Sequence, residues 1–193
     1  MRIVIDGLPI NAASLGIFVE SALRGWDELG LDDELHLVTS PDAGIEVPGS
    51  VHRHDVDLGA RPGLGRIVAQ QRVVPLLARQ LGADAVLGVL PTTTMAPLPC
   101  PRVVIVHDWR HELRPDQFSR AARLLRRSYS VGLRQADDVV AVSERTRQDL
   151  LAARSWLRPE RVHTVLEGAD HVLRWPPAAE GGPDYAVAFG QYG

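Results

Sequence analysis

Short apolar runs alternate with longer amphipathic segments along this chain. Runs with no polar–apolar alternation are typical of strands buried on both faces of a parallel sheet. They lie at residues 3–5, 35–38, 51–56, 85–89, 103–106, 139–142 and 162–166, of which 51–56 is the weakest. The run at 103–106 is the clearest, because four β-branched residues stand together there.

Helical spacing of apolar residues fills the gaps between these runs. From Leu15 to Leu29 apolar residues recur every three or four positions, and Gly30 stands where a helix commonly ends. A second helix is predicted from about residue 64 to 81, and Pro75 should kink or split it.

Two further helices follow in the second half of the chain. Pro115 and Asp116 should open one of them, and Ser143 should cap the next, which runs through Leu151. Strands that alternate with helices predict an α/β fold with a doubly wound, Rossmann-like parallel sheet. In such sheets ligands bind outside the carboxyl ends of the strands.

Composition narrows the class of protein. The chain has 193 residues, 45% of them hydrophobic, and a net charge of −3, which argues against nucleic-acid binding. The single cysteine, Cys100, has no partner for an internal disulfide, which favours a reducing cytoplasm. No segment is typical of a signal peptide or a membrane span, so we expect a cytoplasmic protein.

Several segments, taken in order, carry a family resemblance. They are the strand, loop and helix at 3–26 with Gly16 at the helix start; the strand at 103–106 followed by His107-Asp108; Ala-Asp, an apolar strand and Val-Ser-x-x-Thr at 136–146; Val-Leu-Glu-Gly-Ala-Asp at 165–170; and an apolar strand at 185–190. This series resembles the N-terminal domain of retaining glycosyltransferases of family 4, which have the two-domain GT-B fold.

The resemblance implies a division of the chain. Residues 1–175 would form the acceptor-binding domain, residues 176–183 a linker, and residues 184–193 the first strand of a truncated donor-binding domain. The family's nucleotide-binding basic pair and paired glutamates belong to that second domain. The isolated chain is therefore expected to be inactive. Two departures stand out: the first loop has fewer glycines than usual, and Glu167 stands where asparagine is common.

The resemblance also assigns residues to the cleft. His107 and Asp108 follow a buried strand and would lie at the reacting centre, with His107 binding the transferred sugar. Leu15 and Gly16 stand at a helix start, where unpaired N–H groups suit the donor pyrophosphate. Further substrate-binding candidates follow other strands: Trp109, Arg110, Ser143, Glu144, Glu167 and Gly168. Ser143 also fits a plain helix cap and Glu144 a partner of the helix dipole.

The expected ligands are a UDP- or GDP-sugar and a sugar or lipid-linked acceptor, with no bound cofactor. Arginines between residues 102 and 134 could meet an anionic acceptor or the inner face of a membrane, although a solvated face explains them as well. His52 and His54 share a strand face, but a metal site needs more ligands and none is close in sequence, so no metal is predicted.

Two other functions remain open from the residues. The chain could be a free-standing Rossmann-like module that binds a partner or a phosphorylated ligand without catalysis. It could also be part of an enzyme with the GT-B fold and another activity, such as a relative of an epimerase or a phosphorylase. The segments around Ser143 and Gly168 favour family 4 over the latter.

Overall fold

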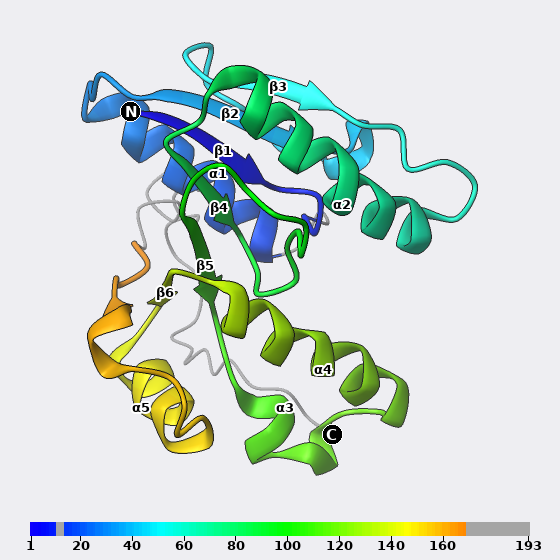
Figure 1. Cartoon of the computed structure of the whole chain (residues 1–193), viewed down its shortest axis with the longest axis vertical. Helices are drawn as coiled ribbons and strands as arrows, with labels where there is room; N and C mark the ends of the chain where they lie inside the picture. Colours follow the sequence, from blue (N-terminus) through cyan, green and yellow to red (C-terminus); the bar gives the residue numbers. More distant parts are fainter. Residues whose placement is uncertain (11–13, 169–193) are drawn as a thin grey trace, which may run out of the picture.

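The computed structural model describes residues 1–10 and 14–168, and the predicted linker and final strand lie outside them. Within that part, seven parallel strands form one sheet in the order β3-β2-β1-β4-β5-β6-β7 (Figure 1). The strands are β1 (Arg2–Asp6), β2 (Glu34–Thr39), β3 (His52–Asp55), β4 (Ala85–Gly88), β5 (Arg102–Val106), β6 (Asp138–Ala141) and β7 (Val162–Thr164). The predicted doubly wound parallel sheet is confirmed.

The strand order reverses between β1 and β4. Strand β1 pairs with β2 on one side and with β4 on the other, so the chain winds outward in both directions from this point. Loops that leave neighbouring strands in opposite directions open a crevice at their carboxyl ends. This topology therefore favours a ligand-binding crevice at the carboxyl ends of β1, β4 and β5.

The helices connect consecutive strands. They are α1 (Ser14–Glu28), α2 (Pro62–Leu81), α3 (Arg110–Leu113), α4 (Arg120–Gln135) and α5 (Glu144–Ala153), with short 3₁₀ turns η1 (Pro41–Ala43), η2 (Pro115–Gln117) and η3 (Pro159–Arg161). Ser143 caps α5 as predicted, since its side chain accepts a hydrogen bond from the N–H of Thr146 at 3.0 Å.

Alternate residues of β1 face different helices, as the pleat of a strand requires. Ile3 and Ile5 pack with Val19 and Leu23 of α1. Val4 packs with Val74 and other residues of α2. The other end of the sheet has its own core beneath α4 and α5, in which Trp109, Leu133 and Leu150 are fully buried. Each face of the sheet is thus covered, which explains why the strands are apolar on both sides.

Two helix predictions need correction. Helix α2 is not split at Pro75, because Val74, Pro75 and Ala78 are all buried and packing holds the helix together across the missing N–H. Pro115 opens only the turn η2.

The long helix begins after Phe118, whose backbone is extended, and Ser119 caps it by accepting from the N–H of Ala122 at 3.1 Å. The predicted start at Pro115 was therefore several residues early, because a better cap follows. The strand predicted at 162–166 is also shorter, and β7 ends at Thr164.

Candidate functional site

A cavity of about 330 Å³ lies at the carboxyl ends of β4, β5 and β6. One wall is the start of α1, with Ser14, Leu15 and Phe18, and another is the loop after β4, with Leu90 and Pro91. His107 and Glu167 line it as well. Elements far apart in sequence thus converge where the fold predicts a ligand.

His107 is held from two sides. Its Nδ1 lies 2.8 Å from Oε1 of Glu167, and its Nε2 lies 3.2 Å from the carbonyl oxygen of Val89. The edge of its ring meets Phe18 of α1 at a centroid distance of 4.8 Å. Both ring nitrogens already lie within hydrogen-bond distance of protein oxygen atoms, and these two contacts hold the ring in place. This geometry suits a positioning or sugar-binding role more than that of a general base.

Asp108 and Arg126 form the charged part of the cavity. Nη1 of Arg126, from α4, lies 3.4 Å from Oδ1 of Asp108, and that oxygen also accepts from the N–H of Arg110 at 3.0 Å. Both side chains of the pair are part-buried. A cation placed beside a histidine and a helix start is suited to an anionic ligand such as a phosphate.

Sequence reasoning missed Arg126, Tyr129 and Phe18. Arg126 and Tyr129 stand three apart on α4, and the guanidinium of Arg126 lies 5.6 Å from the centroid of the Tyr129 ring. Burial raises the pKa of Tyr129 above its usual value, so the hydroxyl remains a donor at neutral pH. Phe18 follows Leu15 by three residues, so helical spacing could have revealed it once Leu15 was assigned to the cleft.

The two residues predicted at the helix start, Leu15 and Gly16, lie in different surroundings. Leu15 lines the cavity together with Ser14. Gly16 is buried in the first turn of α1 and does not line it.

Ser143 and Glu144 serve the packing of α5. Ser143 caps the helix, and the hydroxyl of Thr146 donates to the carbonyl of His107 at 3.2 Å, which fixes the backbone beside the cavity. Glu144 accepts from the hydroxyl of Thr164 on β7 at 2.9 Å, and this bond is the main reason that its pKa is lowered. Val142, the residue before Ser143, lines the cavity.

Trp109 and Arg110 lie outside the cavity wall. Trp109, predicted to bind substrate, is 1% exposed and lies in the core under α4 instead of lining the cavity. It follows His107 by two residues but turns inward, with Nε1 donating to Glu112 at 3.1 Å. Arg110 is largely exposed and lies 3.8 Å from Asp108. Gly168 is exposed beyond Glu167 and does not line the cavity.

The loop after β4 is fixed by a buried carboxylate at the end of β1. Asp6 accepts from the hydroxyl of Thr93 at 2.8 Å, from Nε2 of Gln70 at 3.0 Å and from the N–H of Leu8 at 3.3 Å. Complete burial raises the pKa of Asp6 to about 6, although these three bonds oppose the shift. The carboxylate thereby ties β1 and α2 to the loop that carries Pro91.

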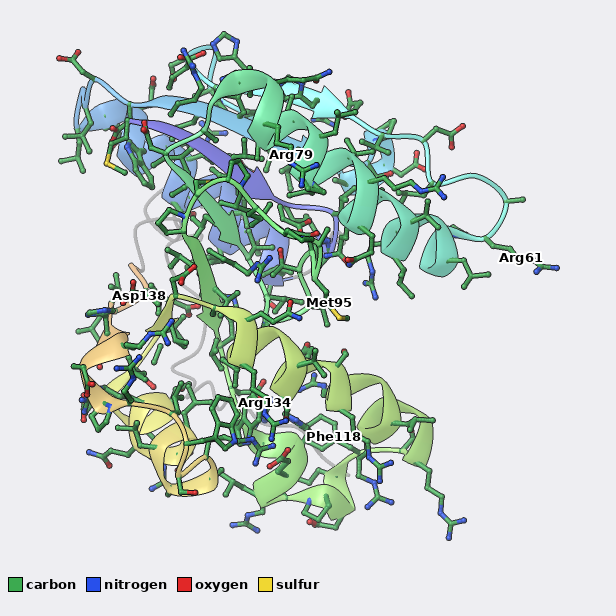
Figure 2. The ribbon with its side chains drawn as sticks, viewed as in Figure 1. Arg61, Arg79, Met95, Phe118, Arg134 and Asp138 are labelled. Carbon is green, nitrogen blue, oxygen red and sulfur yellow. The ribbon has the colours of Figure 1, made fainter. Side chains whose placement is uncertain are left out.

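Helix α4 reaches the same loop by close backbone contact. A Cβ atom at Gly132 would overlap the carbonyl of Pro91, so only glycine allows the helix to pack there. Met95 of this loop lies between α2 and α4 in Figure 2, where a groove is lined by Gln71, Met95 and Leu124. The cavity wall therefore depends on two separate contacts, at Asp6 and at Gly132.

The profile of Glycosyltransferase Family 4 matches residues 15–172. No curated protein sequence matches the chain significantly. None of the helices in the described part is long and apolar enough to cross a membrane.

Solved structures share the fold at low identity. UDP-GlcNAc 2-epimerase from Methanocaldococcus jannaschii superposes with a TM-score of 0.58 at 11% identity, over 86% of this chain and 45% of that one. The lipopolysaccharide outer core galactosyltransferase WaaB gives a TM-score of 0.55 at 9% identity, over 86% and 45%. A sucrose-phosphate synthase structure from Thermosynechococcus elongatus gives 0.52 at 15%, over 86% and 87%.

The chain spans about half the length of the epimerase and of WaaB. Those likenesses establish the fold, the Rossmann-like half of a GT-B architecture. The match at 15–172 includes the predicted cleft residues from Leu15 through Gly168. By this match, which covers most of its length, the chain belongs to Glycosyltransferase Family 4.

Proposed function

We propose that this chain forms the acceptor-side half of a nucleotide-sugar-dependent, retaining glycosyltransferase. The observation that carries the proposal is the cavity in which His107, Arg126 and the start of α1 meet at the carboxyl ends of β4, β5 and β6. A donor-binding domain after the linker at 176–183 would close the cleft. The family membership and the fold support this arrangement.

The chemistry required of this half is mainly positioning and charge stabilisation. Transfer from a nucleotide sugar develops negative charge on the departing diphosphate, and fixed cations and N–H groups lower that barrier. Arg126 supplies the cation, and the start of α1 supplies the dipole. Asp108 holds Arg126 in place through Oδ1, and its second oxygen, which lies 3.8 Å from Arg110, would accept from a sugar hydroxyl.

His107 would contact the transferred sugar. Its bond to Glu167 is short and charge-assisted, whereas its contact with the carbonyl of Val89 is longer. A sugar hydroxyl can replace that longer contact without disturbing the pair. Glu167 thus orients the ring, and Nε2 of His107 is turned toward the sugar.

The finer donor assignment is a UDP- or GDP-sugar. One structure of the same fold, Anabaena HepE, holds UDP and glucose, and the Neisseria meningitidis epimerase holds UDP-GlcNAc. These titles support a nucleoside diphosphate sugar as the class of donor and favour uridine among the bases. Neither structure exceeds 17% identity to this chain.

Assay of the complete gene product tests the proposal. The protein should hydrolyse or transfer from one member of a panel of UDP- and GDP-sugars, and His107→Ala should lower kcat/KM at least about tenfold. His163→Ala is the matched control, because His163 on β7 also pairs with a carboxylate, Asp138 at 2.9 Å, but does not line the cavity. An unchanged rate for His107→Ala would remove this residue from the site.

We further propose that the acceptor is anionic and lipid-linked, and that the protein works at the inner face of the cytoplasmic membrane. Arg120, Arg123 and Arg127 line a second cavity of about 560 Å³ together with Leu124, which is 64% exposed. Basic residues beside an exposed leucine are typical of surfaces that meet phospholipid. The same face lies next to the catalytic cavity along α4.

Vesicle co-sedimentation tests this surface. The protein should bind vesicles that contain phosphatidylglycerol and ignore vesicles of phosphatidylcholine alone, and the double change Arg123→Glu, Arg127→Glu should abolish binding. Equal binding to both kinds of vesicle, or no effect of the charge reversal, would leave these arginines as a solvated face.

A further inference from the structure

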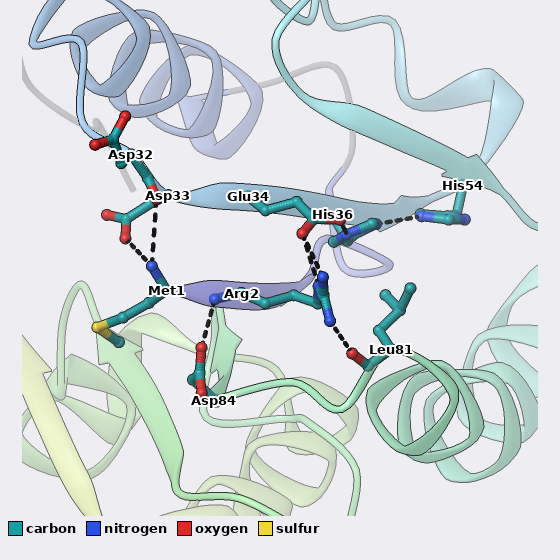
Figure 3. A network of polar contacts seen from close by, with 9 residues as sticks. All are labelled: Met1, Arg2, Asp32, Asp33, Glu34, His36, His54, Leu81 and Asp84. Carbon is teal, nitrogen blue, oxygen red and sulfur yellow. Dashed lines mark hydrogen bonds and ion pairs between the residues drawn. The ribbon is translucent and has the colours of Figure 1, made fainter.

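Three histidines and a glutamate gather at the edge of the sheet farthest from the catalytic cavity. Strands β2 and β3 pair so that His36 stands opposite His52 and Val38 opposite His54. Residues two apart point to the same face of a strand, so Glu34, His36, His52 and His54 share one face. Figure 3 shows Glu34, His36 and His54 in a row along it.

Short contacts connect the four side chains. Nε2 of His36 lies 2.9 Å from Oε1 of Glu34, and Nδ1 of the same ring lies 3.0 Å from Nε2 of His54 (Figure 3). The His52 ring stacks on His36 with centroids 4.7 Å apart and planes 18° from parallel. One ligand atom from each of Glu34, His36 and His52 lies within 4.8 Å of the others.

We propose that Glu34, His36 and His52 bind a divalent transition metal ion of the zinc class. Two imidazoles and one carboxylate are a known protein ligand set for Zn²⁺, with a solvent molecule in the fourth position. Zinc bonds of about 2.0–2.2 Å place tetrahedral ligands roughly 3.3 Å apart, close to the present separation of His36 and Glu34. His52 is exposed on the edge strand and needs only to turn its ring.

His54 would orient the central ligand. Histidine ligands usually donate their second ring N–H to a neighbouring acceptor, which fixes the tautomer. In the metal-bound state, Nδ1–H of His36 would donate to Nε2 of His54, which lies 3.0 Å away, and the lone pair of His36 Nε2 would face Glu34 and the metal.

Arg2 fixes the carboxylate from the opposite side. Its Nε donates to Oε2 of Glu34 at 2.7 Å, and its Nη1 donates to the carbonyl of Leu81 at the end of α2 (Figure 3). Oε1 is thereby left for the metal. The nearby guanidinium charge opposes a second cation, so we expect micromolar affinity, weaker than that of a closed structural zinc site.

The site would join the edge strand β3 to β2, at the other end of the strands from the cavity that His107 lines. Glu34 and His52 are the first residues of their strands, whereas the cavity lies at the carboxyl ends. Binding to the folded state alone raises its stability by mass action. The metal would therefore stabilise the acceptor-side sheet without taking part in transfer.

Zinc titration of the tag-free protein tests the site. Competition against a chromophoric chelator at pH 7.5 should give one Zn²⁺ per chain, and His52→Ala should weaken binding about tenfold or more. Zn²⁺, but not Mg²⁺, should also raise Tm in the wild type and fail to do so in His52→Ala. Because His52 is exposed, this variant should fold normally.

His163→Ala is again the matched control, since it removes a histidine–carboxylate pair from the opposite edge and should leave zinc affinity unchanged. His54→Gln tests the orienting role and should weaken zinc binding less than His52→Ala does. Absence of wild-type binding below about 100 µM, where affinity is no more than about 5.5 kcal/mol, overturns the proposal. Equal affinity in wild type and His52→Ala overturns it as well.

Discussion

The two ends of one sheet carry the same pair of groups in different settings. At the carboxyl end, His107 pairs with Glu167 at 2.8 Å beside a cavity, next to Arg126. At the amino end, His36 pairs with Glu34 at 2.9 Å and is 4% exposed among two further histidines. A histidine–carboxylate pair therefore does not by itself indicate one function. What surrounds it, an open cavity with a cation or additional metal ligands, decides its chemistry.

The same comparison separates activity from stability. Changes at the carboxyl end should affect transfer or the shape of the cavity. Changes at the amino end should affect zinc binding and leave transfer intact.

The largest expected effect is on the framework of the carboxyl end. Gly132→Ala places a Cβ against the carbonyl of Pro91 and should lower the free energy of unfolding by about 2–3 kcal/mol. Gly25→Ala, in α1 with open space around it, should instead stabilise by about 0.5–1 kcal/mol. Urea unfolding of both variants measures the difference. Equal stabilities would show that α4 does not rest on this loop.

A second effect concerns the buried carboxylate Asp6. Its pKa is raised in the folded state to about 6, so the fold favours the protonated form. Its contribution is fully present below pH 4 and is lost as pH rises through 6, a cost of about 2–3 kcal/mol at pH 7.

The difference in unfolding free energy between wild type and Asp6→Asn isolates this group. That difference should change between pH 4.5 and 7 in the sense that wild type loses stability relative to the variant as pH rises. His54 and His111, whose pKa values burial lowers, act in the opposite direction and cancel in the difference. A pH-independent difference would mean that Asp6 ionises normally.

The smallest expected effect on activity tests the comparison between the two ends of the sheet most directly. Glu167→Gln keeps an acceptor for His107 but removes the charge, so kcat/KM should fall about threefold while zinc affinity is unchanged. Glu34→Gln should do the reverse, with zinc binding about tenfold weaker and transfer unaffected. Both assays on both variants are needed. Any crossed effect would show that the two ends of the sheet are coupled.

Much of the fold follows from local pattern. The runs that form β1, β2 and β5 became strands because almost every side chain in them is buried, and Ser143 became a helix cap because its hydroxyl satisfies a free N–H. The start of α4 was placed too early because both Pro115 and Ser119 favour a helix start, and only the extended backbone of Phe118 separates them. The position of such a helix start depends on which of two neighbouring residues that favour a helix start the backbone follows.

The sequence by itself determined the parallel sheet, the edge at which such sheets commonly bind ligands, and His107 and Asp108 as the residues beyond a central strand. The tertiary structure decided which side chains meet: Arg126 with Asp108, Glu167 with His107, and Trp109 turned into the core. It also placed His36 beside His52. The physical reason is that periodicity records burial along one segment, whereas a site is made by contacts between segments, and those contacts depend on register and helix packing.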